Sequence, residues 1–202
     1  FIPFHFFILL FFNINDVDID FDNLNIKNKL LNGGKKKKNK ISMISRNSGD
    51  GTRKFVFDKL IKHFKIDSCG RLCNNHKKIS KGSYNKIKFL SNYKFNICFE
   101  NSNNKNYITE KIYESILAGC IPIYYGNEGN TPPFINEKFI IHYKKNNLNE
   151  IISKIKKIFS SEYQYKQFVD VEKIYIKDMK EYISNYIKKI TQLIKNNLKK
   201  KK

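Results

Sequence analysis

The chain has 202 residues, 41% of them hydrophobic, which suits one domain with a buried core plus an appendage and argues against several domains. Its formal charge of +21 and pI near 9.7 would indicate nucleic acid or an anionic surface as a partner. That indication is weak, because Arg46, Arg53 and Arg71 are the only arginines and the excess of Lys, Asn, Ile, Phe and Tyr is typical of A/T-rich coding sequences.

The first 40 residues contain three distinct segments. The apolar run 1–12 is shorter than the roughly 20 residues of a membrane-spanning helix, and it lacks the basic start and cleavage site of a signal peptide. DVDIDFD (16–22) alternates acidic and apolar residues, as in a half-exposed strand or linker; a metal-binding DxD motif is the alternative. NGGKKKKNK (32–40) is a glycine hinge with a basic run, and it predicts a domain boundary. Because residue 1 is Phe, we treat the chain as a fragment.

Beyond the hinge, predicted strands alternate with predicted helices. Strands are expected at 41–45, 94–99, 121–125 and 139–143, and helices at 52–64, from about 109 to 119, and from about 148 onward. In the first helix Phe57, Leu60, Ile61 and Phe64 share one face, and Gly119 can end the second helix with a left-handed cap. This alternation predicts an α/β fold with a Rossmann-like parallel sheet covered by helices on both faces, whose ligands bind at the carboxyl ends of the strands.

Two of these helices carry cations where helices normally carry acids. Arg53 and Lys54 lie in the first turn after SGDGT, and Lys111 lies in the first turn after NSNNKNYI. A cation beside the positive end of a helix costs about 0.3 to 1 kcal/mol unless an anion lies between them, and a pyrophosphate would supply that anion. For Lys54 the abundance of lysine is sufficient explanation. Arginine is rare in this chain, so the abundance of lysine does not explain Arg53. Its planar guanidinium suits two phosphate oxygens.

Three neighbouring residues are further candidates, each with a structural alternative. Glu110 could accept hydrogen bonds from sugar hydroxyls, or it could simply interact with the helix dipole. Asn101 follows a strand, where its amide could bind phosphate or form an Asx-turn. Tyr107 could stack on a base or sugar, or pack as an ordinary loop tyrosine.

The segment Tyr93–Gly126 resembles the donor-binding signature of the α1,3/α1,4-fucosyltransferase family, glycosyltransferase family 10. The segments ISMISRNSGDGTRKFVF and KIDSCGRLCNN resemble the preceding part of that family, although Asp67, Gly70 and Cys73 have one extra residue before the cysteine. The resemblance covers roughly residues 38–165. The matching signature positions are Phe99, Glu100, Asn101, Ser102, Tyr107, Thr109, Glu110, Lys111, Gly119, Pro122 and Gly126.

The resemblance implies the carboxyl-terminal, GDP-fucose-binding half of a GT-B glycosyltransferase, which transfers L-fucose with inversion to a glycan or glycoprotein hydroxyl, in α1,3 linkage. Arg53 and Lys111 would neutralise the pyrophosphate with help from Asn101. Glu110 would hold ribose or fucose hydroxyls, and Tyr107 would line the same pocket. The resemblance also implies Golgi membrane location on the luminal side, with the membrane reached only through a segment absent here.

The resemblance places the proton-accepting carboxylate in an amino-terminal acceptor domain, so the general base is expected outside this chain. Residues 1–37 would be a remnant of that domain or a linker, 38–165 the donor-binding domain, and 166–202 a helical segment with a basic tail. The sequence requires no cofactor and leaves divalent metal dependence open. A catalytically inactive donor-binding remnant is one alternative function.

The second alternative is a basic nucleic-acid-binding module, but no recognised motif supports it and we expect no nucleic acid partner. Cys98 and Cys120 are expected to be buried, and no metal site is predicted. Cys69, Cys73 and His76, with His63, fit no standard zinc spacing. In the last 55 residues two stripes predict core-facing helices: Ile151, Ile152, Ile155 and Phe159, then Ile183, Ile187, Ile190 and Ile194.

Overall fold

The computed structural model describes residues 37–132 and 135–169, together with 185, 188, 189, 191, 192 and 196. The apolar run 1–12, the acidic alternation 16–22 and most of the glycine hinge lie outside the described residues. So do the second isoleucine stripe and the last residues of the basic tail. No helix in the described part of the chain is both long enough and apolar enough to cross a bilayer.

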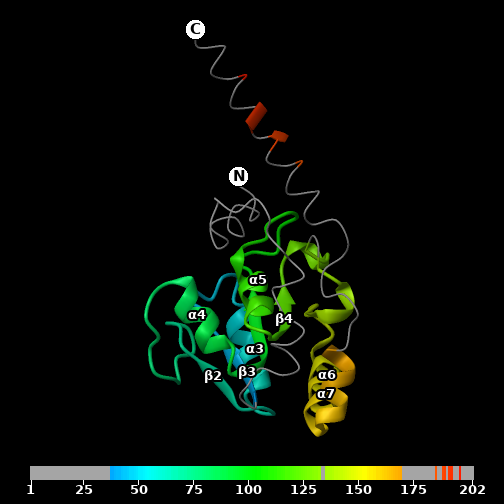
Figure 1. Ribbon diagram of the computed structural model, residues 1–202. Coiled ribbons are helices and arrows are strands. Elements are labelled where there is room, and N and C mark those ends of the chain that lie inside the picture. The colour runs from blue at the N-terminus through cyan, green and yellow to red at the C-terminus, as the bar shows by residue number, and fades with distance from the viewer. Residues whose placement is uncertain are drawn as a thin grey trace.

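Five parallel strands form one sheet in the order β2-β1-β3-β4-β5. Phe95 pairs with Ile121 and Phe99 with Tyr125, so the central strands end at the same edge. This arrangement confirms the predicted α/β fold with a parallel sheet (Figure 1). The strands are β1 Lys38–Met43, β2 Ile66–Ser68, β3 Tyr93–Phe99, β4 Ile121–Tyr125 and β5 Ile141–His142.

Every residue of β3 and β4 is buried, as expected for the middle of a parallel sheet with both faces covered. The polar members of β3 are satisfied inside the fold. Lys94 donates to Glu162 at 2.9 Å and lies 4.3 Å from the ring centroid of Tyr165. Asn96 accepts a hydrogen bond from the Ser42 hydroxyl of β1 at 3.2 Å.

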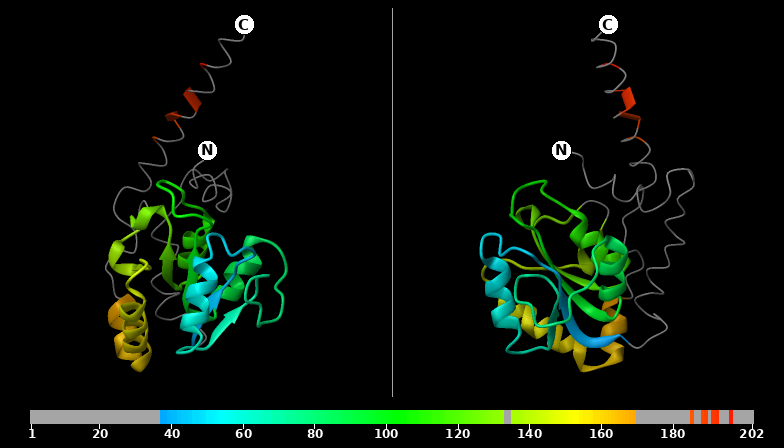
Figure 2. Two further views of the ribbon diagram at one scale, coloured as in Figure 1. Left: turned by 180° about the vertical axis from the view of Figure 1, so that it is seen from behind. Right: turned by 90° about the vertical axis from the view of Figure 1, so that its left-hand side faces the viewer.

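Helices cover both faces of the sheet (Figure 2). α4 and α5 pack together on one side, and α3 lies on the other. On the α3 side, Phe159 of α6 packs edge-on against Phe95 of β3 and against Phe64, at centroid distances of 5.0 and 5.9 Å. The helices are α3 Thr52–Leu60, α4 Ser83–Leu90, α5 Glu110–Leu117, α6 Leu148–Ser160 and α7 Glu162–Val169.

Local residues determine where the helices α5 and α3 begin and end. Thr109 is the N-cap of α5, and Gly119, with φ of 72°, adopts the left-handed conformation that was predicted to end this helix. α3 is shorter than predicted and ends at Leu60. Phe57 and Leu60 are buried as predicted, together with Val56. The residue after the helix, Ile61, is 41% exposed, so its placement on the core face was wrong.

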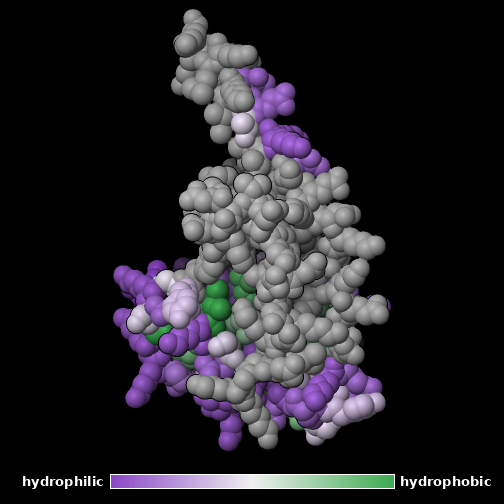
Figure 3. All heavy atoms as spheres, viewed as in Figure 1, coloured by the Kyte–Doolittle hydropathy of each residue, from purple (hydrophilic) through white to green (hydrophobic). Residues whose placement is uncertain are grey.

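The core-facing stripe of α6 is confirmed, since Ile151, Ile152 and Ile155 are buried and Phe159 packs partly buried against the same core. Tyr165 and Val169 of α7 join the same core. On the face shown in Figure 3, most described residues at the periphery are hydrophilic. Most lysines of the described residues are exposed, around a conventional apolar core.

Candidate functional site

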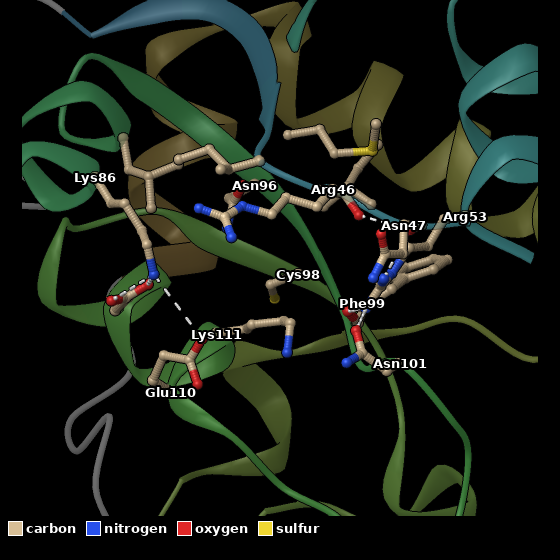
Figure 4. Close-up of a pocket in the computed structure, with 16 residues that line it drawn as sticks. Arg46, Asn47, Arg53, Lys86, Asn96, Cys98, Phe99, Asn101, Glu110 and Lys111 are labelled. Atoms are coloured by element: carbon tan, nitrogen blue, oxygen red, sulfur yellow. Dashed lines mark hydrogen bonds and ion pairs between the residues drawn. The ribbon is translucent and has the colours of Figure 1, made fainter. Parts of the chain in front are cut away.

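A cavity of about 430 Å³ lies where β1 and β3 end, between α3 on one side and α4 and α5 on the other (Figure 4). Parallel α/β sheets bind ligands at this edge, because loops and helix amino termini converge there. The lining side chains are rich in charge and amide groups. They include Arg46, Asn47, Arg53, Lys86, Asn96, Cys98, Asn101, Glu110, Lys111 and Glu114.

Arg53 lies in the first turn of α3 and is only 3% exposed. Its guanidinium donates to the carbonyl oxygens of Asn47 at 2.9 Å and Phe99 at 2.5 Å, and to the side-chain oxygen of Asn101 at 2.8 Å. Burial lowers its pKa below the ordinary arginine value. A guanidinium has five N–H donors, and these three bonds use three of them to hold the loop before α3 against the end of β3.

Asn101 lies just beyond β3 and is exposed, with its amide oxygen held by Arg53. Close backbone packing fixes the same loop. A Cβ added to Gly49 would lie 2.8 Å from the Asn101 carbonyl oxygen, and Gly49 has φ of 65°. The loop that precedes α3 therefore needs glycine at this position to approach Asn101.

Lys111 is held by a buried carboxylate. Its ammonium lies 3.0 Å from Glu100 and 2.8 Å from the Thr109 hydroxyl. Glu100 also accepts from the Thr109 backbone N–H at 2.8 Å and from its hydroxyl at 2.7 Å. The Glu100 side chain has no exposed surface, and that of Lys111 is 23% exposed. Glu100 thus joins the end of β3 to the start of α5 and orients the lysine.

Glu110 and Glu114 line the cavity beside Lys86 of α4. The Lys86 ammonium lies 3.1 Å from both carboxylate oxygens of Glu114 and 3.9 Å from Glu110. The side chain of Glu114 is 4% exposed and that of Glu110 is 34% exposed. Glu110 is therefore the more accessible of the two carboxylates for an incoming hydroxyl.

The structure brings Arg53, Asn101, Glu110 and Lys111 together around one cavity. Tyr107 is half-buried in the loop between β3 and α5 and is not among the residues that line it. Tyr107 is close enough to Arg53 to influence it electrostatically, so the two side chains lie in the same neighbourhood.

The sequence reasoning missed Arg46, Lys86 and Glu114 as lining residues. Arg46 carried a usable signal, because it is one of three arginines in a lysine-rich chain and directly follows a predicted strand. Lys86 and Glu114 carried none. Each belongs to a helix whose position depends on the long-range packing of α4 against α5.

Cysteines in the described residues are free thiols. Cys98 and Cys120 are buried as predicted, and burial raises the pKa of Cys120 to about 11. The Cys69 sulfur lies 3.5 Å from Nδ1 of His76. Within the described part of the chain, no group of three or more His, Cys, Asp or Glu side chains is arranged to hold a metal ion.

The sequence that builds this site matches a known protein family. The sequence model of "Glycosyltransferase family 10 (fucosyltransferase) C-term" matches residues 34–201. The chain belongs to this family. The resemblance seen in Tyr93–Gly126 is thereby confirmed and extends over most of the chain.

Similar proteins include fucosyltransferases from several organisms. An alpha-(1,3)-fucosyltransferase of Helicobacter pylori is 38% identical over 81 residues, which is 40% of this chain and 17% of that protein. A GDP-fucose protein O-fucosyltransferase 3 of Xenopus tropicalis is 30% identical over 123 residues, or 55% of this chain and 26% of that protein. The chain thus matches about a sixth to a quarter of the length of these relatives.

A solved structure shares the fold. The crystal structure of an alpha1,3-fucosyltransferase with GDP-fucose aligns with a TM-score of 0.65 at 24% identity, over 84% of this chain and 52% of that one. The parallel sheet and its helices therefore correspond to about half of a GT-B fucosyltransferase.

Proposed function

We propose that this chain is the donor-binding half of a fucosyltransferase, which holds GDP-fucose while L-fucose passes to a hydroxyl of a glycan or glycoprotein acceptor. The observation that carries the proposal is the convergence of Arg53, Asn101, Glu110 and Lys111 on one cavity at the carboxyl edge of the sheet. These residues lie in the segments that match the family, and the relatives are named for fucose transfer.

Charge stabilisation is the main chemical task of such a half. When the acceptor oxygen attacks the fucose anomeric carbon, that carbon's bond to the pyrophosphate oxygen breaks and negative charge collects on the leaving GDP. Arg53 and Lys111 lie in the first turns of α3 and α5, whose amino termini add positive potential. We propose that these groups, with Asn101, hold the leaving pyrophosphate.

The sugar and ribose hydroxyls need acceptors of another kind. Glu110 is the accessible carboxylate of the cavity and would accept their hydrogen bonds, while Glu114 stays engaged with Lys86. For Tyr107 we propose a position at the margin of the donor site rather than in the described cavity wall. Attack on the face opposite GDP gives inversion, and we propose an α1,3 linkage.

The proton of the acceptor hydroxyl must pass to a base. We propose that this base belongs to a separate acceptor-binding region outside the chain, that residues 38–165 form the donor domain, and that 1–37 and 166–202 flank it. We propose a luminal Golgi location on the same family grounds.

Two other functions make distinct predictions. A donor-binding remnant would bind GDP-fucose without transferring fucose, even when an acceptor domain is supplied. A nucleic-acid module, favoured only by the charge of +21, would bind oligonucleotides with an affinity that falls steeply as salt increases and that is indifferent to GDP.

Calorimetric titration of the chain with GDP-fucose tests the proposal. We expect saturable binding that weakens at least tenfold in Lys111→Ala and in Arg53→Ala, as expected for loss of a charge-assisted hydrogen bond. Lys54→Ala is the matched control, because Lys54 shares the first turn of α3 but pairs with Asp58 at the surface. A folded wild-type chain that fails to bind GDP-fucose would overturn the proposal.

A further inference from the structure

Arg46 lines the cavity but is not one of the signature positions of the family. It follows β1 closely and is exposed. The backbone beside it is fixed, because the Ser45 carbonyl accepts from Leu72 N–H at 3.1 Å and the Ser45 hydroxyl donates to the Asn47 carbonyl at 3.0 Å. Arg46 therefore combines a well-held backbone with a solvent-accessible charge.

The other cations of the cavity are already engaged. Lys86 lies beside Glu114 and Lys111 lies beside Glu100, each within 3.1 Å. Arg53 donates to three oxygens. Within 37–132 and 135–169, no hydrogen bond or ion pair engages the Arg46 guanidinium. An anion that enters the cavity therefore meets Arg46 as the cation with no competing partner in the described residues.

The direction of the side chain agrees with this role. Figure 4 shows Arg46 extending across the cavity, away from Arg53 and Asn101 and toward the wall that carries Lys86. Arg46 and Arg53 thus reach the cavity from the same end of β1 and address different parts of it.

We propose that Arg46 is an additional phosphate-contacting residue, which binds the diphosphate of the nucleotide from the side opposite Arg53. The inference rests on the proposed function, since it takes a nucleoside diphosphate as the ligand. Two arginines with no carboxylate partner would then face a group that carries two or more negative charges. The planar fork of Arg46 suits two oxygens of one phosphate.

Calorimetric titration with GDP, guanosine and inorganic pyrophosphate separates this role from others. In Arg46→Gln we expect GDP affinity to fall about tenfold and to depend less on salt, while guanosine affinity stays unchanged. Arg46→Lys keeps the charge without the fork and should lose less. Arg71→Gln is the control, because Arg71 is the remaining arginine, is exposed, and does not line the cavity.

Each outcome either supports or overturns the proposed role of Arg46. Unchanged GDP affinity in Arg46→Gln, or an equal loss for guanosine and GDP, overturns the inference. If wild type does not bind GDP at all, the proposed function fails, and pyrophosphate alone tests Arg46. Pyrophosphate binding that weakens in Arg46→Gln but not in Arg71→Gln then supports a phosphate site; binding that is absent or equal in both overturns it.

Discussion

The carboxylate of Glu100 lies 3.0 Å from the ammonium of Lys111 and has no exposed surface. Glu100 also receives two hydrogen bonds from Thr109, so a single buried carboxylate holds both the cap and the first-turn lysine of α5. Within the shared signature, Glu100 thus positions groups of the site rather than facing the cavity. Because the Glu100 side chain is fully buried, its interaction with Lys111 should be strong enough to measure by mutation.

We expect Glu100→Gln to lower the free energy of unfolding by about 3 kcal/mol, because it leaves the partly buried Lys111 ammonium without its counter-charge at a fully buried position. Urea denaturation of Glu100→Gln, Lys111→Met and the double variant gives the coupling between them. The exposed Lys54–Asp58 pair is the reference cycle and should show much weaker coupling. Equal coupling in both cycles would contradict the buried role of Glu100.

The guanidinium of Arg53 joins the loop before α3 to the end of β3 and the residues that follow it, and we expect that lysine cannot replace it. In Arg53→Lys a single ammonium must serve the carbonyls of Asn47 and Phe99 and the amide oxygen of Asn101. We expect unfolding to become easier by about 2 kcal/mol, since at least one buried acceptor loses its donor. Thermal and urea unfolding measure this, with Lys54→Gln as the neighbouring control. Wild-type stability in Arg53→Lys would show that the charge alone suffices.

The sequence predicted the Tyr93–Gly126 unit well, because its signals are local. A seven-residue buried strand, a Thr cap and a left-handed Gly119 need no knowledge of the rest of the fold. The three-residue β2 and the weakly patterned α4 were missed. β2 forms by pairing Ile66–Ser68 with β1, and α4 begins after Gly82 without a side-chain cap.

The same distinction holds for the site. Arg53 and Lys111 were found because each lies in a helix first turn that the sequence marks. The approach of Lys86 to Glu114 depends on α4 packing against α5, and nothing in the residues around either one indicates it. The engagement of Arg53 with backbone carbonyls was equally hidden, since backbone acceptors leave no trace in side-chain patterns.

Gly70 marks a close approach that should tolerate no side chain. A Cβ there would lie 1.6 Å from the carbonyl oxygen of Ser45, at the base of Arg46. We expect Gly70→Ala to cost about 1 to 3 kcal/mol of unfolding free energy and to displace the Ser45–Arg46 backbone. Urea denaturation measures the cost. Gly82→Ala is the comparison, because it has φ of 104° with open space around its Cβ position, and so reports backbone strain alone.

His142 of β5 should make stability depend on pH near neutrality. Burial lowers its pKa below the ordinary value of about 6.5, with Lys144 and Lys154 acting in the same direction and Glu137 opposing. The unfolded chain therefore binds a proton more readily than the folded one. The contribution of neutral His142 is fully present above about pH 6.5 and is lost as pH falls through the lowered pKa of the folded state.

We expect the free energy of unfolding to decrease on acidification from about pH 7.5 to pH 5, with a slope from His142 of at most about 1.4 kcal/mol per pH unit. His142→Phe keeps a ring against Tyr124, whose centroid lies 6.1 Å away, and should flatten that slope. His63→Gln changes an exposed histidine and should leave it in place. Urea denaturation at a series of pH values measures all three chains. A slope that survives in His142→Phe would assign the dependence to other groups.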